Sequence, residues 1–289
     1  MLFLKTTPLL DSFAGPFFAA LFVILLLLGW KFPLRRDHFS KFRRLIRNAI
    51  FSTPGFALAR ISLVPVPLFT ALWAEDHHVG LLRFLPLPHF LSLVLGILLM
   101  DYVYWWWHVA LHRLPFLWRF HNVHHSDLAM DVSTGVRFHF GEIIFSLPMR
   151  VGAVLLLGID FWSLVAFELL FETLNLFEHS NWRLPIKLER VLNTFLVTPR
   201  MHGIHHSIVR RETDSNWGTI FCWWDKAHQT LRRDIPQDEI TVGVAAYRDE
   251  AELTIGRLFL LPFGKQRPWR LPDGTIPDRP PKPAPALEP

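Results

Sequence analysis

Cysteine is almost absent from this chain of 289 residues, in which Cys222 stands alone. A single cysteine excludes a disulfide framework within the chain, an iron–sulfur cluster held by the chain itself and a cysteine-rich zinc module. Charged side chains are also scarce, at 19% against roughly 25% in an ordinary soluble domain. Because apolar residues reach 51%, the composition excludes a disordered chain and argues against an ordinary soluble globule.

Long apolar stretches predict an all-α integral membrane bundle with about four to five spans. Residues 13–30 carry no charge and would extend about 27 Å as a helix, close to the ~30 Å core of a bilayer. Basic residues follow this stretch rather than precede it, which indicates a retained membrane helix rather than a cleaved signal peptide. Further spans are predicted at residues 49–74, which several prolines would kink, at 84–100, and at 143–158 and 161–178 as a hairpin.

The distribution of basic residues predicts the orientation of these spans. Residues 31–48 hold seven Lys or Arg and one Asp between two apolar segments. We interpret this run as a basic cytoplasmic loop facing anionic lipid, and we expect no nucleic-acid partner. Counting spans places residues 108–142 and everything after residue 178 on the cytoplasmic side of the inner membrane, and residues 75–83 on the other side.

Four regions are expected along the chain. N-terminal membrane helices occupy residues 1–100, a histidine-rich helical region that includes the hairpin 143–178 occupies 101–235, and a cytoplasmic segment occupies 236–267. The last region, 268–289, holds 8 of the 22 prolines and is expected to be a disordered tail.

Three charged residues fall inside the predicted hairpin, where charge is costly. Arg150 and Glu168 each lie nine residues from a turn near residue 159, on opposite arms. We therefore expect these two side chains to pair, or Glu168 and Glu172 to line a polar cavity.

Histidine is enriched, with 15 in the chain, and eight of them form three clusters. The clusters have the spacings H-x-x-x-H, H-x-x-H-H and H-x-x-H-H, and they comprise His108, His112, His121, His124, His125, His202, His205 and His206. On a helix, positions i, i+3 and i+4 share one face, so each cluster aims its imidazoles in one direction. Imidazole suits Fe, Zn, Cu and Ni, and eight neutral ligands exceed what one tetrahedral zinc uses. The clusters therefore predict a two-metal site beside the membrane.

The residues around these clusters form longer motifs across roughly residues 95–235. They include D-Y-V-Y-W-W-W-H-V-A-L-H, W-R-F-H-N-V-H-H-S, R-F-H-F-G-E, F-E-H-S-N-W, V-T-P-R-M-H-G-I-H-H-S and T-D-S-N-W-G. These motifs resemble the fatty acid hydroxylase / sterol desaturase superfamily of integral-membrane di-iron enzymes. The resemblance implies that the eight clustered histidines are catalytic metal ligands, joined by His179 in E-H-S-N-W and by His139 in R-F-H-F-G-E.

The sequence departs from the family pattern at a few positions. Val109 replaces the usual arginine of the first motif, and Phe140 replaces the usual proline after His139. His228 occupies the place of a phenylalanine in W-D-K-A-H-Q-T, so we do not expect it to bind metal. His77 and His78 match no family position and are expected to be solvated.

Carboxylates near the clusters are candidates for orienting the histidines. A ligating imidazole normally donates its other N–H to a carboxylate or a carbonyl. The candidates are Asp101, Asp127, Asp131, Glu142, Glu178, Asp214 and Asp225.

The resemblance implies an oxygen-dependent lipid oxidase with two Fe ions, which hydroxylates or desaturates a C–H bond of a sterol, fatty acyl chain or other membrane lipid. Its co-substrate would be O2. The sequence has no His-Pro-Gly-Gly element, cysteine cluster or dinucleotide-binding glycine motif. Electrons would therefore come from a separate cytochrome b5-like protein, ferredoxin or reductase. Two alternatives stay open: a zinc-dependent membrane lipid hydrolase, active without oxygen or reductant, and a non-catalytic metal-binding membrane protein.

Overall fold

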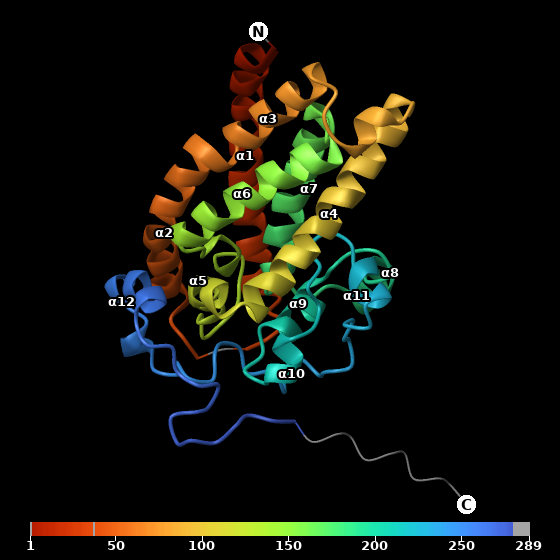
Figure 1. The fold of residues 1–289 in the computed structure, drawn as a ribbon. Helices are drawn as coiled ribbons and strands as arrows, with labels where there is room; N and C mark the ends of the chain where they lie inside the picture. Colours follow the sequence, from red (N-terminus) through yellow and green to blue (C-terminus); the bar gives the residue numbers. More distant parts are fainter. Residues whose placement is uncertain (1, 37, 280–289) are drawn as a thin grey trace, which may run out of the picture.

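The computed structural model describes residues 2–36 and 38–279, with side chains described from residue 12 onward. The described residues form helices and no β-strand, which confirms the predicted all-α class. The long helices run between the two ends of the bundle (Figure 1). They are α1 (Leu2–Lys31), α2 (Lys41–Leu58), α3 (Pro65–Asp76), α4 (His89–Arg113), α6 (Phe140–Leu157) and α7 (Phe161–His179).

Among the described residues, four stretches are long and apolar enough to cross a membrane. They are Ser12–Lys31, Lys41–Phe84, His89–Arg113 and Phe140–Leu157. This agrees with the predicted membrane bundle. The fifth stretch predicted from the sequence, 161–178, is helical but is not among these four. It carries three glutamates, and its buried residues, such as Leu164 and Phe167, show that it lies inside the bundle.

The second membrane stretch is bent, as its prolines predict. A π-helical turn at Ala59–Leu63 separates α2 from α3, and the N–H of Val64 donates to the carbonyl of Ala59 over 3.0 Å. Pro65 begins α3, where its missing N–H costs no helical hydrogen bond.

The hairpin of α6 and α7 turns where the sequence places it. Gly158 follows α6 with φ of 68°, a left-handed conformation that suits glycine. Asp160 caps α7, because its side chain accepts from the N–H of Ser163. The two arms are joined by the predicted ion pair, in which Arg150 Nη1 donates to Glu168 Oε1 over 2.6 Å.

The basic run 31–48 differs from the predicted lipid-facing loop. Its second half is the first part of α2, which Ser40 caps by accepting from the N–H of Arg43. Arg35 and Arg44 are buried, at 7% and 1% exposure. The prediction of a loop facing lipid is therefore wrong for these residues, because protein acceptors surround the two guanidinium groups. Arg35 Nη1 donates to Gln237 Oε1 over 2.6 Å and to the carbonyl of Pro199 over 3.2 Å, and the acceptors of Arg44 are described below.

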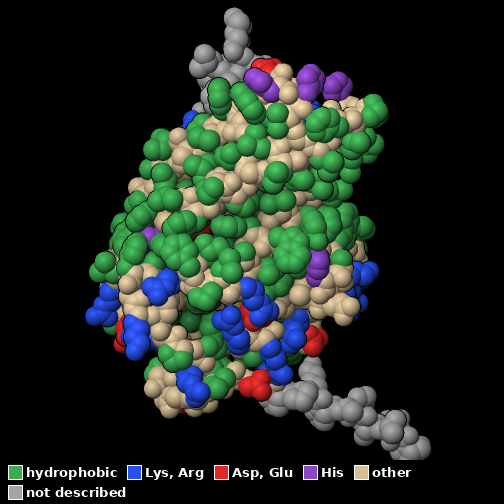
Figure 2. Space-filling model, viewed as in Figure 1, with side chains coloured by type: hydrophobic (Ala, Val, Ile, Leu, Met, Phe, Trp, Pro, Cys, Tyr) green, Lys and Arg blue, Asp and Glu red, His purple; other side chains and the backbone are tan. Residues whose placement is uncertain are grey.

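The short helices gather at one end of the bundle, the lower end in Figure 1. Lys and Arg side chains concentrate at this same end, whereas apolar side chains cover the middle of the molecule (Figure 2). The connection between α3 and α4 lies at the opposite end, and it holds the exposed His77 and His78. The short helices are α5 (Pro115–His125), α8 (Ile186–Leu192), α9 (Pro199–His205), α10 (Arg210–Thr213), α11 (Trp223–Ala227) and α12 (Ile255–Leu260), with 3-10 turns at Thr134–Val136, Glu250–Glu252 and Leu261–Phe263. A further 3-10 turn, Leu81–Phe84, belongs to the connection between α3 and α4.

The predicted tail, 268–289, is described as far as residue 279. Trp269 Nε1 donates to the carbonyl of Ile208 over 2.6 Å, and Arg279 Nε donates to Glu212 Oε1 over 2.7 Å. This part of the tail therefore contacts the histidine-rich end of the protein. Residues 280–289 lie outside the described residues.

Candidate metal centre

Nine of the ten histidines predicted to bind metal converge in two groups. One group consists of His108, His112, His121, His125 and His205, and the other of His124, His179, His202 and His206. Within each group, one ring nitrogen of every residue lies within 4.8 Å of the others. Eight of the nine residues are buried, and His108 is half-buried. The structure thus brings together side chains of four helices, α4, α5, α7 and α9, from across residues 108–206.

The two H-x-x-H-H motifs are each shared between the groups. In α5, His121 and His125 face one group and His124 faces the other. In α9 and the residue after it, His202 and His206 join the group of His124, and His205 joins the group of His125. Positions i and i+4 therefore stay together on one helical face, as the spacing predicts, while the remaining histidine of each motif crosses to the other group.

Backbone carbonyls fix the orientation of three of these rings. In each, Nδ1 lies 2.8 Å from a carbonyl oxygen: His108 with Trp217, His205 with Ser215, and His179 with Asn175. A carbonyl can only accept, so Nδ1 carries the proton of the neutral ring. The Nε2 atom of each ring therefore presents a lone pair to its group, as metal ligation requires.

The spacing of the ring nitrogens fits a shared metal ion. Nε2 of His179 lies 3.1 Å from Nε2 of His124 and 2.9 Å from Nε2 of His202, which lies 3.2 Å from Nε2 of His206. Two nitrogens that each bind one ion at ~2.0–2.1 Å are separated by roughly 3.0–3.4 Å, so the observed distances match ligands of a single ion.

Unpaired ring nitrogens in the other group support the same interpretation. Both nitrogens of His112 and of His125, and Nε2 of His108, His121 and His205, are buried without a hydrogen-bond partner in the described structure. Buried polar atoms without partners are costly and rare. A metal ion would satisfy these lone pairs, so the donor set fits a metal in each group.

The protonation of the histidines outside the spans also suits metal binding. Burial, together with the neighbouring histidines, lowers the pKa of His124, His125, His202 and His206 well below the ordinary value. Burial lowers the pKa of His205 to about 3. These rings are neutral at physiological pH, which is the form that binds metals.

Two of the predicted carboxylates approach the histidines directly. Glu142 Oε1 lies 3.1 Å from Nδ1 of His121, within hydrogen-bonding distance. Glu178 Oε2 lies 3.5 Å from Nδ1 of His202, beyond a well-formed hydrogen bond. Glu142 therefore orients its histidine as predicted, and Glu178 places negative charge beside the second group.

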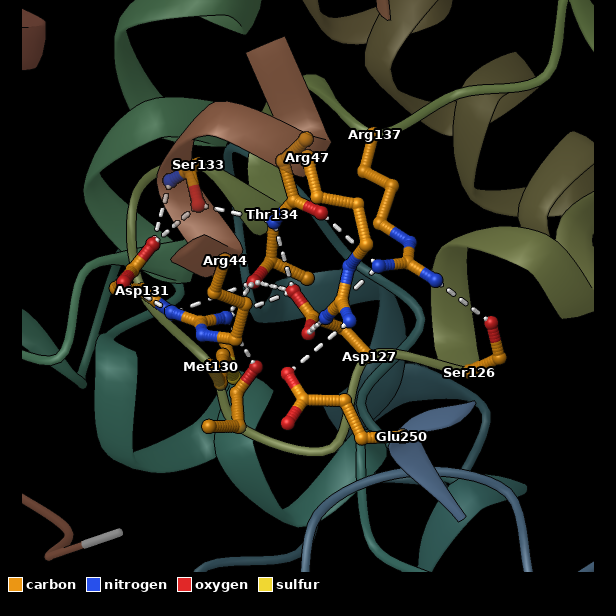
Figure 3. Close-up of polar contacts among 12 residues, drawn as sticks. Arg44, Arg47, Ser126, Asp127, Met130, Asp131, Ser133, Thr134, Arg137 and Glu250 are labelled. Atoms are coloured by element: carbon orange, nitrogen blue, oxygen red, sulfur yellow. Dashed lines mark hydrogen bonds and ion pairs between the residues drawn. The ribbon is translucent and has the colours of Figure 1, made fainter. Parts of the chain in front are cut away.

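Asp127 and Asp131 contact arginines instead of histidines (Figure 3). Arg44 of α2 donates from Nη1 to Asp127 over 2.7 Å and pairs through Nη2 with Asp131. Arg137 donates to the carbonyl of Val123 over 3.0 Å, near the carboxyl end of α5. This buried network holds the helix that carries three of the histidines against α2.

Charge balance within this network sets the ionisation of Asp127. Burial opposes ionisation of this carboxyl, but Arg44, Arg137 and Arg47 outweigh burial and hold its pKa below the ordinary value. Asp127 is therefore an anion at neutral pH, enclosed by guanidinium groups.

The remaining carboxylates act on the surrounding loops. Asp225 accepts from the N–H of Trp217 over 2.9 Å, and so holds the residue whose carbonyl orients His108. Asp101 accepts from Trp224 Nε1 over 2.7 Å. Asp214 pairs with Arg113 at 3.3 Å. None of these three contacts a histidine of the two groups in the described structure.

His139 is not part of either group. Its Nδ1 accepts from the N–H of Gly141 over 3.0 Å, so the ring caps the start of α6, and its Nε2 lies 3.3 Å from the carbonyl of Phe259. Both ring nitrogens thus have backbone partners. The structure replaces the predicted metal-binding role of His139 with a helix-capping role. His228 also lies outside both groups, as expected, with Nε2 3.0 Å from the hydroxyl of Tyr102.

Asn216 has a positioning role that the sequence analysis missed. Its φ is 53°, a left-handed conformation that asparagine adopts more readily than most residues. Its side chain accepts from the N–H of Arg232 and donates to the carbonyl of Met201. The turn at Asn216 presents the carbonyls on both sides of it, those of Ser215 and Trp217, to two histidines of the same group. The signal available in the sequence is the asparagine of T-D-S-N-W-G.

A comparison with protein families decides the identity of this region. The fatty acid hydroxylase family matches residues 93–230, which contain all nine converging histidines. Residues 93–230 of this chain thus match a fatty acid hydroxylase domain. Members of the family are lipid-modifying oxygenases that depend on iron.

Individual relatives of this chain are distant. It is 27% identical to alkylglycerol monooxygenase of Danio rerio, over 94% of this chain and 61% of that protein. It is 27% identical to the ornithine lipid hydroxylase OlsE of Rhizobium tropici, over 54% of this chain and 46% of that protein. It is 24% identical to very-long-chain aldehyde decarbonylase GL1-4 of Oryza sativa subsp. indica, over 48% of this chain. The chain thus spans about half to three-fifths of the length of the first two relatives. No solved structure matches it.

A cavity of about 160 Å³ connects the histidines of the two groups to the interior of the bundle. His108, His121, His124, His179 and His202 form part of its wall. Helices α2, α4, α6 and α7 and the π-helical turn Ala59–Leu63 supply most of the remaining wall, largely with apolar side chains such as Phe56, Leu63, Leu111, Ile143, Met149 and Phe171. The cavity therefore joins the candidate metal centre to a space suited to a lipid chain.

Proposed function

We propose that this protein is an iron- and oxygen-dependent hydroxylase of a membrane lipid. The observation that carries the proposal is the convergence of nine histidines in two groups beside an apolar cavity inside a membrane bundle. The hydroxylation of a lipid, as opposed to its desaturation, accords with the relatives named as a monooxygenase and a hydroxylase.

The nine histidines of the two groups would hold two iron ions. Iron bound there would supply the activation of O2 that an unreactive C–H bond requires. Burial lowers the pKa values of His124, His125, His202, His205 and His206 and so keeps their imidazoles neutral. The carbonyls of Trp217, Ser215 and Asn175 fix the tautomers of three rings, those of His108, His205 and His179. The apolar cavity would exclude water and hold one lipid chain in a fixed orientation, because small misplacements of reacting atoms are costly in rate.

The orientation in the membrane and the electron donor are part of the proposal. Lys and Arg gather at the end of the bundle where the short helices lie (Figure 2), and by the positive-inside rule this end would face the cytoplasm. Arg113 and Arg211 are exposed there, with 58% and 44% of their side-chain surface accessible. An acidic face of a separate electron-transfer protein would be attracted to this surface.

Isotope labelling tests the reaction. The full-length protein, purified in detergent and loaded with iron, is given a chemical reductant, isotopically labelled O2 and a membrane lipid extract. We expect a lipid product that contains one labelled oxygen atom. A product that has lost two hydrogens without gaining label would contradict hydroxylation, and turnover with zinc in the absence of oxygen would indicate the hydrolase.

A matched pair of variants tests the site. His125→Asn removes a histidine of one group, and His139→Asn makes the same change at the capping histidine, where asparagine still serves as a helix cap. We expect His125→Asn to lose bound iron and labelled product, and His139→Asn to keep both. Equal losses in the two variants would contradict the assignment of the ligand groups.

A further inference from the structure

The inner end of the cavity contains a polar group that the metal centre does not use. Tyr104, Arg150 and Glu172 line the cavity beyond the histidines, and they come from α4, α6 and α7. Tyr104 lies one helical turn before His108, about 6 Å along α4, and Glu172 lies seven residues before His179, about 10 Å along α7. These side chains thus lie one to two turns deeper in the bundle than the two histidine groups.

The donors of this polar group are only partly satisfied. The hydroxyl of Tyr104 and Nε of Arg150 are buried and have no hydrogen-bond partner in the described structure. Both residues are more than nine-tenths buried, at 7% and 6% exposure. Arg150 uses Nη1 for its 2.6 Å contact with Glu168, a residue that does not line the cavity. The guanidinium also lies over the Tyr104 ring at 4.9 Å, which fixes both groups in place.

A purely structural role explains only part of this arrangement. The pair of Arg150 and Glu168 joins the two arms of the hairpin, and the Tyr104 ring packs edge-on against Phe167 and Phe171 at 4.8 and 4.7 Å. A phenylalanine at position 104 would make the same ring contacts. The hydroxyl is therefore a buried donor without a structural purpose, in a setting where an unpaired donor is costly.

We propose that this polar group binds an acceptor oxygen carried by the lipid substrate, such as a hydroxyl, ether or carbonyl oxygen. The inference rests on the proposed function, because it names a chemical feature of the substrate. Tyr104 would donate its O–H to the oxygen, and Arg150 would donate from Nε or add its positive charge. The distance from this group to the histidines would then determine which C–H bond of the chain faces the metal centre.

Equilibrium binding to the purified full-length protein in detergent tests the proposal without requiring turnover. The probes are stearyl alcohol and methyl stearate, which carry an acceptor oxygen, and octadecane, which has none. Tyr104→Phe removes only the hydroxyl. Tyr247→Phe is the matched control, since Tyr247 is also 7% exposed and also has an arginine, Arg267, at 4.9 Å over its ring, but lies away from the cavity.

We expect wild type and Tyr247→Phe to bind the oxygen-bearing probes between about twofold and about tenfold more tightly than octadecane, the range for one neutral hydrogen bond. Tyr104→Phe should lose this preference and bind octadecane as wild type does, which also shows that the variant is folded. If it does not fold, Arg150→Lys, which keeps the charge beside Glu168 but lacks Nε, should reduce the preference instead.

Equal binding of all three probes by wild type would overturn the proposal and indicate that the polar group holds only water. A preference that persists in Tyr104→Phe would also overturn it. Failure of the proposed function is distinguishable, because it would appear as absence of oxygen-dependent turnover while the binding preference remained. With active enzyme, Tyr104→Phe should also spread hydroxylation of stearyl alcohol over more carbon positions than Tyr247→Phe does.

Discussion

Replacing Asp127 by asparagine tests whether buried charge holds the α5 histidines in place. The Asp127 side chain is fully buried and accepts from Arg44 at 2.7 Å, Asn48 at 2.9 Å and Thr134 at 3.0 Å. Asparagine has nearly the same shape, but it removes the negative charge and turns an N–H2 group toward guanidinium donors. Arg44 retains Asp131, so the network loses one of its anions and keeps its cations.

The expected loss follows from burial. Removing one partner of a buried ion pair costs about 3–5 kcal/mol, which for a chain of this size lowers the melting temperature by on the order of 10 °C. Glu252→Gln is the matched control, because Glu252 makes two hydrogen bonds to Arg267, at 2.7 and 2.8 Å, with 31% of its side chain exposed. An exposed pair contributes only about 0–1 kcal/mol, so this variant should melt close to wild type.

The melting temperature of both variants is measured by thermal unfolding in detergent, with tryptophan fluorescence as the signal. Iron content is determined in parallel. We expect Asp127→Asn to bind iron more weakly as well, since the network around Asp127 holds α5, which carries three of the histidines. Equal melting temperatures for the two variants would refute the reasoning, because burial is the main difference between the two carboxylates.

The remaining predictions concern protonation and the turn at Asn216. Without metal, the melting temperature should fall as pH decreases from neutral through the ordinary histidine range, because the unfolded chain binds protons there that the buried rings do not. A melting temperature independent of pH between about 7 and about 5 would contradict this. Asn216→Ala should weaken iron binding more than Asn216→Gly, since glycine tolerates the left-handed backbone; iron affinity measured by competition with a chelator distinguishes the two.

The sequence predicts the helices and the histidine clusters well because both depend on local spacing. Apolar stretches of membrane length predicted the four spans, and the i, i+4 spacing placed two histidines of each H-x-x-H-H motif in one group, whereas the third histidine joined the other group. The pairing of Arg150 with Glu168 was predictable from their equal distance to the turn. His179 required the family resemblance, because a single histidine at the end of α7 carries no spacing signal of its own.

Other features depend on contacts between distant parts of the chain. The basic run was interpreted as a loop facing lipid, because nothing local reveals that Asp127 and Asp131 would enclose Arg44. The role of His139 also depends on its surroundings, since the same ring can bind a metal or cap a helix. The assignment of each histidine to one of two groups depends on how α5 and α9 cross, which no periodicity encodes.

Iron stoichiometry tests the central claim most directly. The account predicts that full-length protein loaded anaerobically with ferrous iron, and freed of excess metal, holds close to two iron atoms per chain. His125→Asn and His202→Asn, one from each group, should each hold fewer, and His139→Asn should match wild type. Protein that binds no iron, or that keeps its full iron content when both groups are disrupted together, would contradict the account.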